Sequence, residues 1–91
     1  MPKRPRKDDP TYLLRLGQEE GEKVAAELIR TNPDGLARGE RLTADQYHFL
    51  VRQVSDRLRK TNRLPVNKLA GERFGAFEQP FWEVLHSYEL V

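Results

Sequence analysis

The stretch "TADQYHFLVRQVSDRLRKTN", Thr43–Asn62, carries the clearest helical signal in the chain. Thr43 and Gln46 have the spacing of a capping box, in which each side chain bonds the other residue's backbone at a helix start. Apolar side chains then recur every three or four residues, as on the buried face of a helix: Tyr47, Leu50, Val51, Val54 and Leu58. We therefore predict a helix that ends between Lys60 and Asn62.

The other faces of this helix are basic. Five cations lie on it or just beyond it, and they are candidates for contacting the phosphates of a nucleic acid: Arg52, Arg57, Arg59, Lys60 and Arg63. The alternative is a solvated face with internal ion pairs, in which Asp56 pairs with Arg52 or Lys60 at four-residue spacing.

A first helix is predicted from Asp9 to about Arg30. Asp9 can cap it, proline is tolerated in its first turn, and the turn signal "NPDG" follows it at residues 32–35. Gly17 and Gly21 lie on one face of this helix. They indicate either close approach of another backbone or a break into two shorter helices, and the sequence leaves both open. We expect the acidic cluster Glu19, Glu20 and Glu22 to be a solvated face or the first turn of the second piece.

Two further helices are predicted near the C-terminus. A short one spans about Val66 to Phe74 and ends at Gly75, since glycine commonly terminates helices. The last begins near Gln79-Pro80 and runs to about Glu89. Phe77 and Trp82 lie off its apolar stripe, whereas Phe81 is expected in the core. The fold class is therefore all-α, with four to five helices in a single domain over residues 11–91, preceded by a disordered basic arm at residues 1–10.

The segment "RLPVNKLAGERFGAFEQPFWEVL" resembles a helix-turn-helix, with "LA" and "FG" in its first helix and turn. Together with "YHFLVRQVSDRLRKTNRLP" upstream, its order is similar to the DNA-binding domain of GntR-type winged-helix regulators over about residues 47–85. The resemblance implies DNA binding and transcription regulation. The chain departs from the family where basic residues should open the second helix, because Glu78 and Trp82 stand there. A carboxylate near the DNA backbone is repelled.

Other classes of function have little support in the sequence. The chain of 91 residues has no cysteine, so thiolate metal sites and disulfides are excluded. No catalytic, phosphate-loop or dinucleotide motif occurs, so we expect neither an enzyme nor a bound cofactor. No apolar run is long enough to span a membrane, and no secretory signal is present, so we expect a cytoplasmic protein.

Two functions fit these patterns. The first is a small nucleic-acid-binding regulator, with DNA favoured over RNA, that uses the basic helix, Lys68 and Arg73, and the arm residues Lys3, Arg4, Arg6 and Lys7. The second is a protein-binding adaptor or inhibitor with an aromatic and acidic C-terminal helix, whose contact residues are Phe77, Trp82 and Tyr88. A homodimer through Gly17 and Gly21, or through the aromatic residues, would serve either function.

Overall fold

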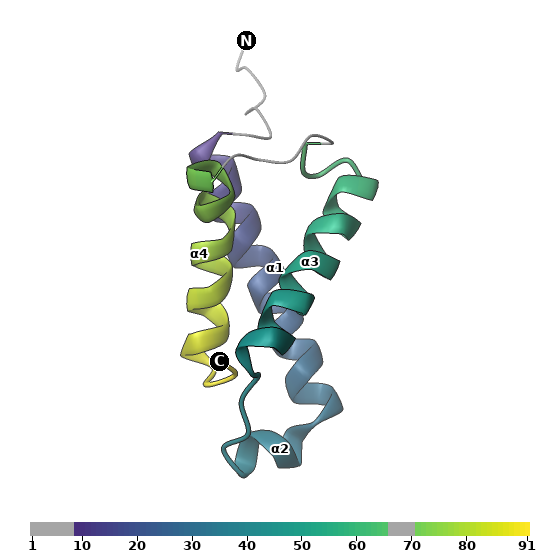
Figure 1. The fold of residues 1–91 in the computed structure, drawn as a ribbon. Helices are drawn as coiled ribbons and strands as arrows, with labels where there is room; N and C mark the ends of the chain where they lie inside the picture. The colour runs from purple at the N-terminus through teal and green to yellow at the C-terminus, as the bar shows by residue number, and fades with distance from the viewer. Residues whose placement is uncertain (1–8, 66–70) are drawn as a thin grey trace.

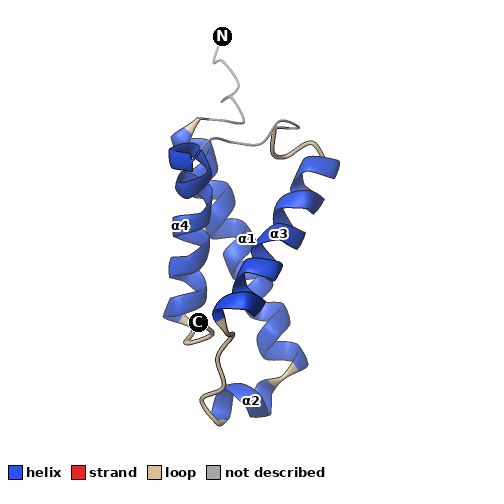
Figure 2. Cartoon of the chain, viewed as in Figure 1, coloured by secondary structure: helices blue, strands red, loops and turns tan. Residues whose placement is uncertain are grey.

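The computed structural model describes residues 9–65 and 71–91, and within these ranges it contains four helices and no strand (Figure 1, Figure 2). The predicted all-α fold class is confirmed. The helices are α1 (Pro10–Thr31), α2 (Pro33–Ala37), α3 (Ala44–Lys60) and α4 (Gly71–Ser87). The predicted contacts of Lys3, Arg4, Arg6, Lys7 and Lys68 lie outside the described residues.

Helix α1 begins as the sequence predicts and continues without a break. The Asp9 carboxylate accepts hydrogen bonds from the backbone amides of Thr11 and Tyr12, and Pro10 occupies the first turn. The helix passes through Gly17 and Gly21, so the predicted alternative of two shorter helices is wrong.

The connection to α3 contains a short helix where only a turn was expected. In α2, the backbone amide of Gly35 donates to the Asn32 side chain at 3.1 Å, which satisfies one of the free amides at the helix start. Helix α3 then begins at the predicted capping box, with both hydrogen bonds between Thr43 and Gln46 formed. It ends at Lys60, as expected.

Helix α4 corrects the predicted division of the C-terminal segment. It is continuous from Gly71 to Ser87, so neither an end at Gly75 nor a new start at Pro80 is observed, and the turn of a helix-turn-helix is not formed at Gly75. Phe74, Phe77 and Phe81 continue one helical stripe across both positions. Burying this stripe stabilises the helix against the cost of an interior proline, about 3 kcal/mol.

Glycines in α1 allow α4 to approach closely. The two helices run in the same direction side by side (Figure 1). A Cβ atom on Gly17 would overlap the Phe77 carbonyl oxygen and lie 2.9 Å from Pro80 Cγ. One turn later, a Cβ on Gly21 would lie 2.9 Å from the Cβ of Val84. The two glycines therefore mark the helix-packing face that the sequence left as one of two alternatives.

Helix α3 runs in the opposite direction and completes the core. The buried side chains of α3 belong to the same hydrophobic cluster as those of α1 and α4. The buried apolar residues are Leu13, Leu16, Ala25, Tyr47, Val51, Val54, Leu58, Leu64, Phe77, Phe81, Leu85 and Leu90. The C-terminal segment contacts the chain just before α3, where the Leu42 amide donates to the Leu90 carbonyl oxygen at 2.8 Å.

Candidate functional site

A buried carboxylate on α1 engages two of the predicted phosphate-binding residues. Glu20 is 1% exposed. Arg57 Nη2 donates to Glu20 Oε2 at 2.5 Å, and Arg63 Nη1 donates to Oε1 at 3.1 Å. Lys23 lies 3.5 Å from the same carboxylate. Glu20 is therefore not the solvated residue that the sequence suggested, but an ion-pair centre that ties α1 to α3.

The same cluster extends to the surface. Arg63 Nη2 also donates to Glu19 at 3.2 Å, and the Tyr12 hydroxyl donates to the Arg63 carbonyl oxygen at 2.7 Å. Arg63 is thus held at both its side chain and its backbone. The charge of Arg63 is thereby largely neutralised by Glu19 and Glu20, so it attracts a phosphate less than an unpaired arginine would.

The remaining cations of α3 lie on its outer side. Asp56 pairs with Arg59 at 3.2 Å, three residues on, rather than with the predicted Arg52 or Lys60. Arg52 and Lys60 are exposed, and neither has an ion-pair partner among the residues described. Arg73, at the start of α4, is also exposed. The structure therefore does not unite the five predicted cations in one free basic surface.

The three predicted protein-binding residues have different environments. Phe77 is completely buried, so its assignment to a binding surface is wrong: it belongs to the core stripe of α4. Tyr88 is 40% exposed, but its hydroxyl donates to Glu22 at 2.6 Å, which raises the pKa of this tyrosine. Trp82 is 39% exposed, with its indole stacked on His86 at a ring-centroid separation of 4.7 Å.

A recess opens beside Trp82 between α3 and α4. It has a volume of about 290 Å³ and is lined by Tyr47, Gly75, Glu78, Gln79 and Trp82. A Cβ added to Gly75 would meet nothing within 4 Å, so the absence of a side chain there contributes to the hollow. Glu78, Gln79 and Trp82 lie three, four and seven positions after Gly75, so the four α4 residues share one broad helix face.

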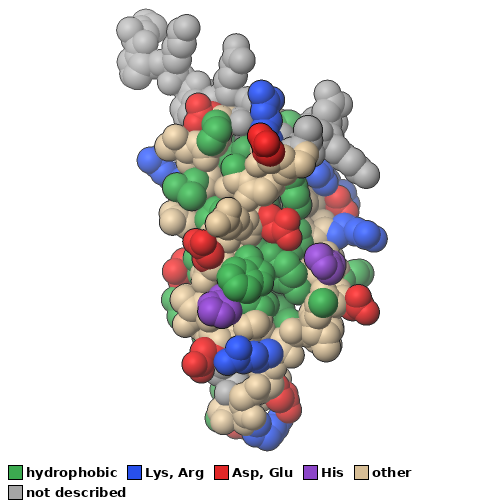
Figure 3. Space-filling model, turned by 60° about the vertical axis from the view of Figure 1, so that its left-hand side comes forward, with side chains coloured by type: hydrophobic (Ala, Val, Ile, Leu, Met, Phe, Trp, Pro, Cys, Tyr) green, Lys and Arg blue, Asp and Glu red, His purple; other side chains and the backbone are tan. Residues whose placement is uncertain are grey.

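A tyrosine and a carboxylate meet at the wall of this recess. The Tyr47 hydroxyl donates to Glu78 Oε1 at 3.4 Å. Burial and the neighbouring Glu78 charge both raise the pKa of Tyr47. Figure 3 shows one face of the molecule, on which a hydrophobic patch lies between two histidine side chains with acidic groups near it. The site therefore combines aromatic surface with negative charge.

The sequence identified part of this recess. Trp82 was predicted as a contact residue, and Glu78 belongs to the acidic edge that was expected on the same C-terminal helix. Tyr47, Gly75 and Gln79 were not predicted. The spacing of Gly75, Glu78, Gln79 and Trp82 would have placed them on one face if α4 had been predicted as continuous. The contribution of Tyr47 comes from another helix and depends on tertiary packing.

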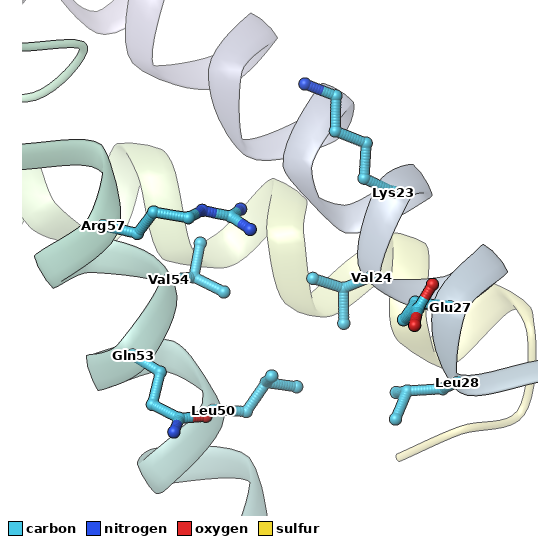
Figure 4. A pocket seen from close by; sticks show the side chains of 8 residues that line it. All are labelled: Lys23, Val24, Glu27, Leu28, Leu50, Gln53, Val54 and Arg57. Atoms are coloured by element: carbon cyan, nitrogen blue, oxygen red, sulfur yellow. The ribbon is translucent and has the colours of Figure 1, made fainter. Parts of the chain in front are cut away.

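A second hollow lies between α1 and α3 (Figure 4). It is larger, about 530 Å³, and its apolar walls come from Val24 and Leu28 on one helix and Leu50 and Val54 on the other. Charged and polar side chains border it: Lys23, Glu27, Gln53 and Arg57. This groove was not anticipated from the sequence.

Comparison of the chain with protein-family models, with curated proteins and with solved structures finds no match. Within residues 9–65 and 71–91, no three His, Cys, Asp or Glu side chains cluster in a way that could hold a metal ion. No helix in the described part of the chain combines the length and apolar character needed to cross a membrane.

Proposed function

We propose that this chain is a small non-enzymatic protein-binding module whose contact surface is the recess beside Trp82. The observation that carries the proposal is a tryptophan 39% exposed next to a concave site, on a helix whose phenylalanines are buried in the core or packed against it. Tryptophan is enriched among the residues that dominate binding energy, and such residues occupy pockets at the centre of interfaces.

Binding through this site should depend on Trp82 far more than on another exposed aromatic residue. Phe49 is the matched control, since it is 61% exposed on α3 and does not line the recess. Proteins captured by the wild-type chain should be lost from Trp82→Ala and retained by Phe49→Ala, with both variants giving the wild-type circular dichroism spectrum. Each captured protein is then purified and its affinity for the three chains measured directly.

The expected loss for Trp82→Ala is at least 2 kcal/mol, about thirtyfold in Kd, which is the range of interface hot spots. Equal losses for Trp82→Ala and Phe49→Ala would remove the basis for the proposal, because they would show that no particular surface is used.

Nucleic-acid binding is a second candidate function. The observation that favours it is the exposure of Arg52 and Lys60 on α3, without ion-pair partners among the described residues. In this proposal the two side chains contact phosphates, together with the basic arm of residues 1–10. Arg57 and Arg63 contribute less, because Glu20 already holds them.

A salt titration of binding to labelled duplex DNA and RNA tests this second candidate. If Arg52 contacts a phosphate, Arg52→Ala should reduce the slope of log K against log salt by about 0.9. Arg15→Ala is the matched control, since it removes one exposed arginine from α1. Binding that is independent of salt, or identical slopes for both variants, would exclude a phosphate contact by Arg52.

A further inference from the structure

The chemistry of the recess beside Trp82 selects among side chains that a partner can present. One ring face of Trp82 is covered by His86, which follows it by four residues. Glu78 precedes it by four residues, one helical turn away in the other direction from His86, and lines the recess together with Trp82. An incoming group thus meets an aromatic surface and a carboxylate together.

The carboxylate of Glu78 retains capacity for another hydrogen bond. Tyr47 reaches only Oε1, at the long distance of 3.4 Å, whereas a charge-assisted bond is normally shorter than 3 Å. None of the five residues that line the recess is basic. An anionic group would therefore be repelled, and an apolar group would cover Glu78 without pairing its charge, which is costly.

A planar cation satisfies both walls at once. A guanidinium group stacks on aromatic rings through cation–π attraction and donates two parallel hydrogen bonds to a carboxylate. The volume of about 290 Å³ suits one long side chain rather than a whole helix. We infer that the recess formed by Trp82, Tyr47 and Glu78 binds an arginine side chain of a partner polypeptide, an inference that rests on the proposed protein-binding function.

Trp82 is the single tryptophan of the chain, so its indole gives one assignable NMR signal. The probe is the peptide acetyl-Gly-Arg-Gly-amide, compared with the same peptide carrying citrulline, which has the shape of arginine without its charge. The arginine peptide should shift the indole signal and bind about tenfold more tightly than the citrulline peptide, because it adds cation–π and charge-assisted bonds. A lysine peptide should bind more weakly than arginine, since it cannot form the planar bidentate contact.

Two variants complete the test. Glu78→Gln keeps an acceptor for Tyr47 but removes the charge, so it should reduce the preference for arginine over citrulline to the part that cation–π attraction to Trp82 supplies. Gly75→Leu places a side chain at the recess and should weaken all peptides, while the helix itself is favoured by the loss of glycine. Equal binding of the arginine and citrulline peptides to the wild-type chain, or shifts confined to residues outside the recess, would overturn the inference.

The outcome is separable from that of the proposed function. If Trp82→Ala loses a protein partner but arginine shows no preference over citrulline, the chain binds proteins through Trp82 by other chemistry. If the arginine preference is found but no captured protein depends on Trp82, the recess recognises the cation while the proposed function fails.

Discussion

Replacing Gly17 with alanine tests the close contact between α1 and α4. The added methyl group would overlap the Phe77 carbonyl oxygen and lie 2.9 Å from Pro80 Cγ. Neither neighbour can rotate aside, because one is backbone and the other is a closed ring. We therefore take the upper part of the range for overpacking, about 3 kcal/mol. Alanine restores about 1 kcal/mol of helix propensity, which leaves a net destabilisation of about 2 kcal/mol.

The matched control is Gly75→Ala, the same change inside α4, where a Cβ meets nothing within 4 Å. It should stabilise the fold by up to about 1 kcal/mol. Thermal unfolding followed by circular dichroism separates the two, because 1 kcal/mol corresponds to about 4–8 °C in Tm for a domain of this size. Gly17→Ala should lower Tm by about 8–16 °C. A Gly17→Ala variant at least as stable as the wild type would refute the close packing of the two helices.

Three further predictions concern buried polar groups. Arg57→Ala combined with Arg63→Ala should lower the free energy of unfolding in urea by about 3 kcal/mol, because it removes two partners of the buried Glu20 carboxylate. Glu20→Gln should lower it by less, about 1–2 kcal/mol. The reverse order would contradict the burial of Glu20. Ser55→Ala should raise stability by about 1 kcal/mol, since the Ser55 hydroxyl is buried without a hydrogen-bond partner in the structure; a lower Tm would indicate an unseen partner. Burial raises the pKa of Tyr47 above its value in the unfolded chain. The contribution of Tyr47 to the free energy of unfolding is therefore fully present below about pH 10 and is lost as the pH rises further. Tyr47→Phe should flatten the fall in unfolding free energy that is measured above about pH 10.

Local signals in the sequence predicted where α1 and α3 begin. The cap at Asp9 and the capping box at Thr43 depend on residues within one helical turn, and both are formed. The break predicted at Gly75 is wrong because the local preference of glycine was weighed above the stripe of phenylalanines that continues past it. That stripe is stabilised by contact with α1, which a local pattern does not contain.

The candidate site was less accessible to prediction. Glu20 lies seven and four residues after the buried Leu13 and Leu16, a helical spacing that could have indicated its burial. Its partners Arg57 and Arg63 come from a distant part of the chain, and their pairing depends on how the helices pack. The recess beside Trp82 has the same origin, because one of its walls comes from α3 and the other from α4.

The parallel contact of α1 with α4 has a consequence for how the fold is assembled. It joins distant parts of the chain, as shown by the bond between Glu22 and Tyr88, which are 66 residues apart. The closing of such a long loop opposes the contact by chain entropy, so we expect α3 to form early and the α1–α4 face to close late. Cutting the chain between α3 and α4 removes the connection but not the complementary surfaces. The glycine face of α1 and the proline-bearing face of α4 are thus an internal interface that two fragments can reconstitute by association.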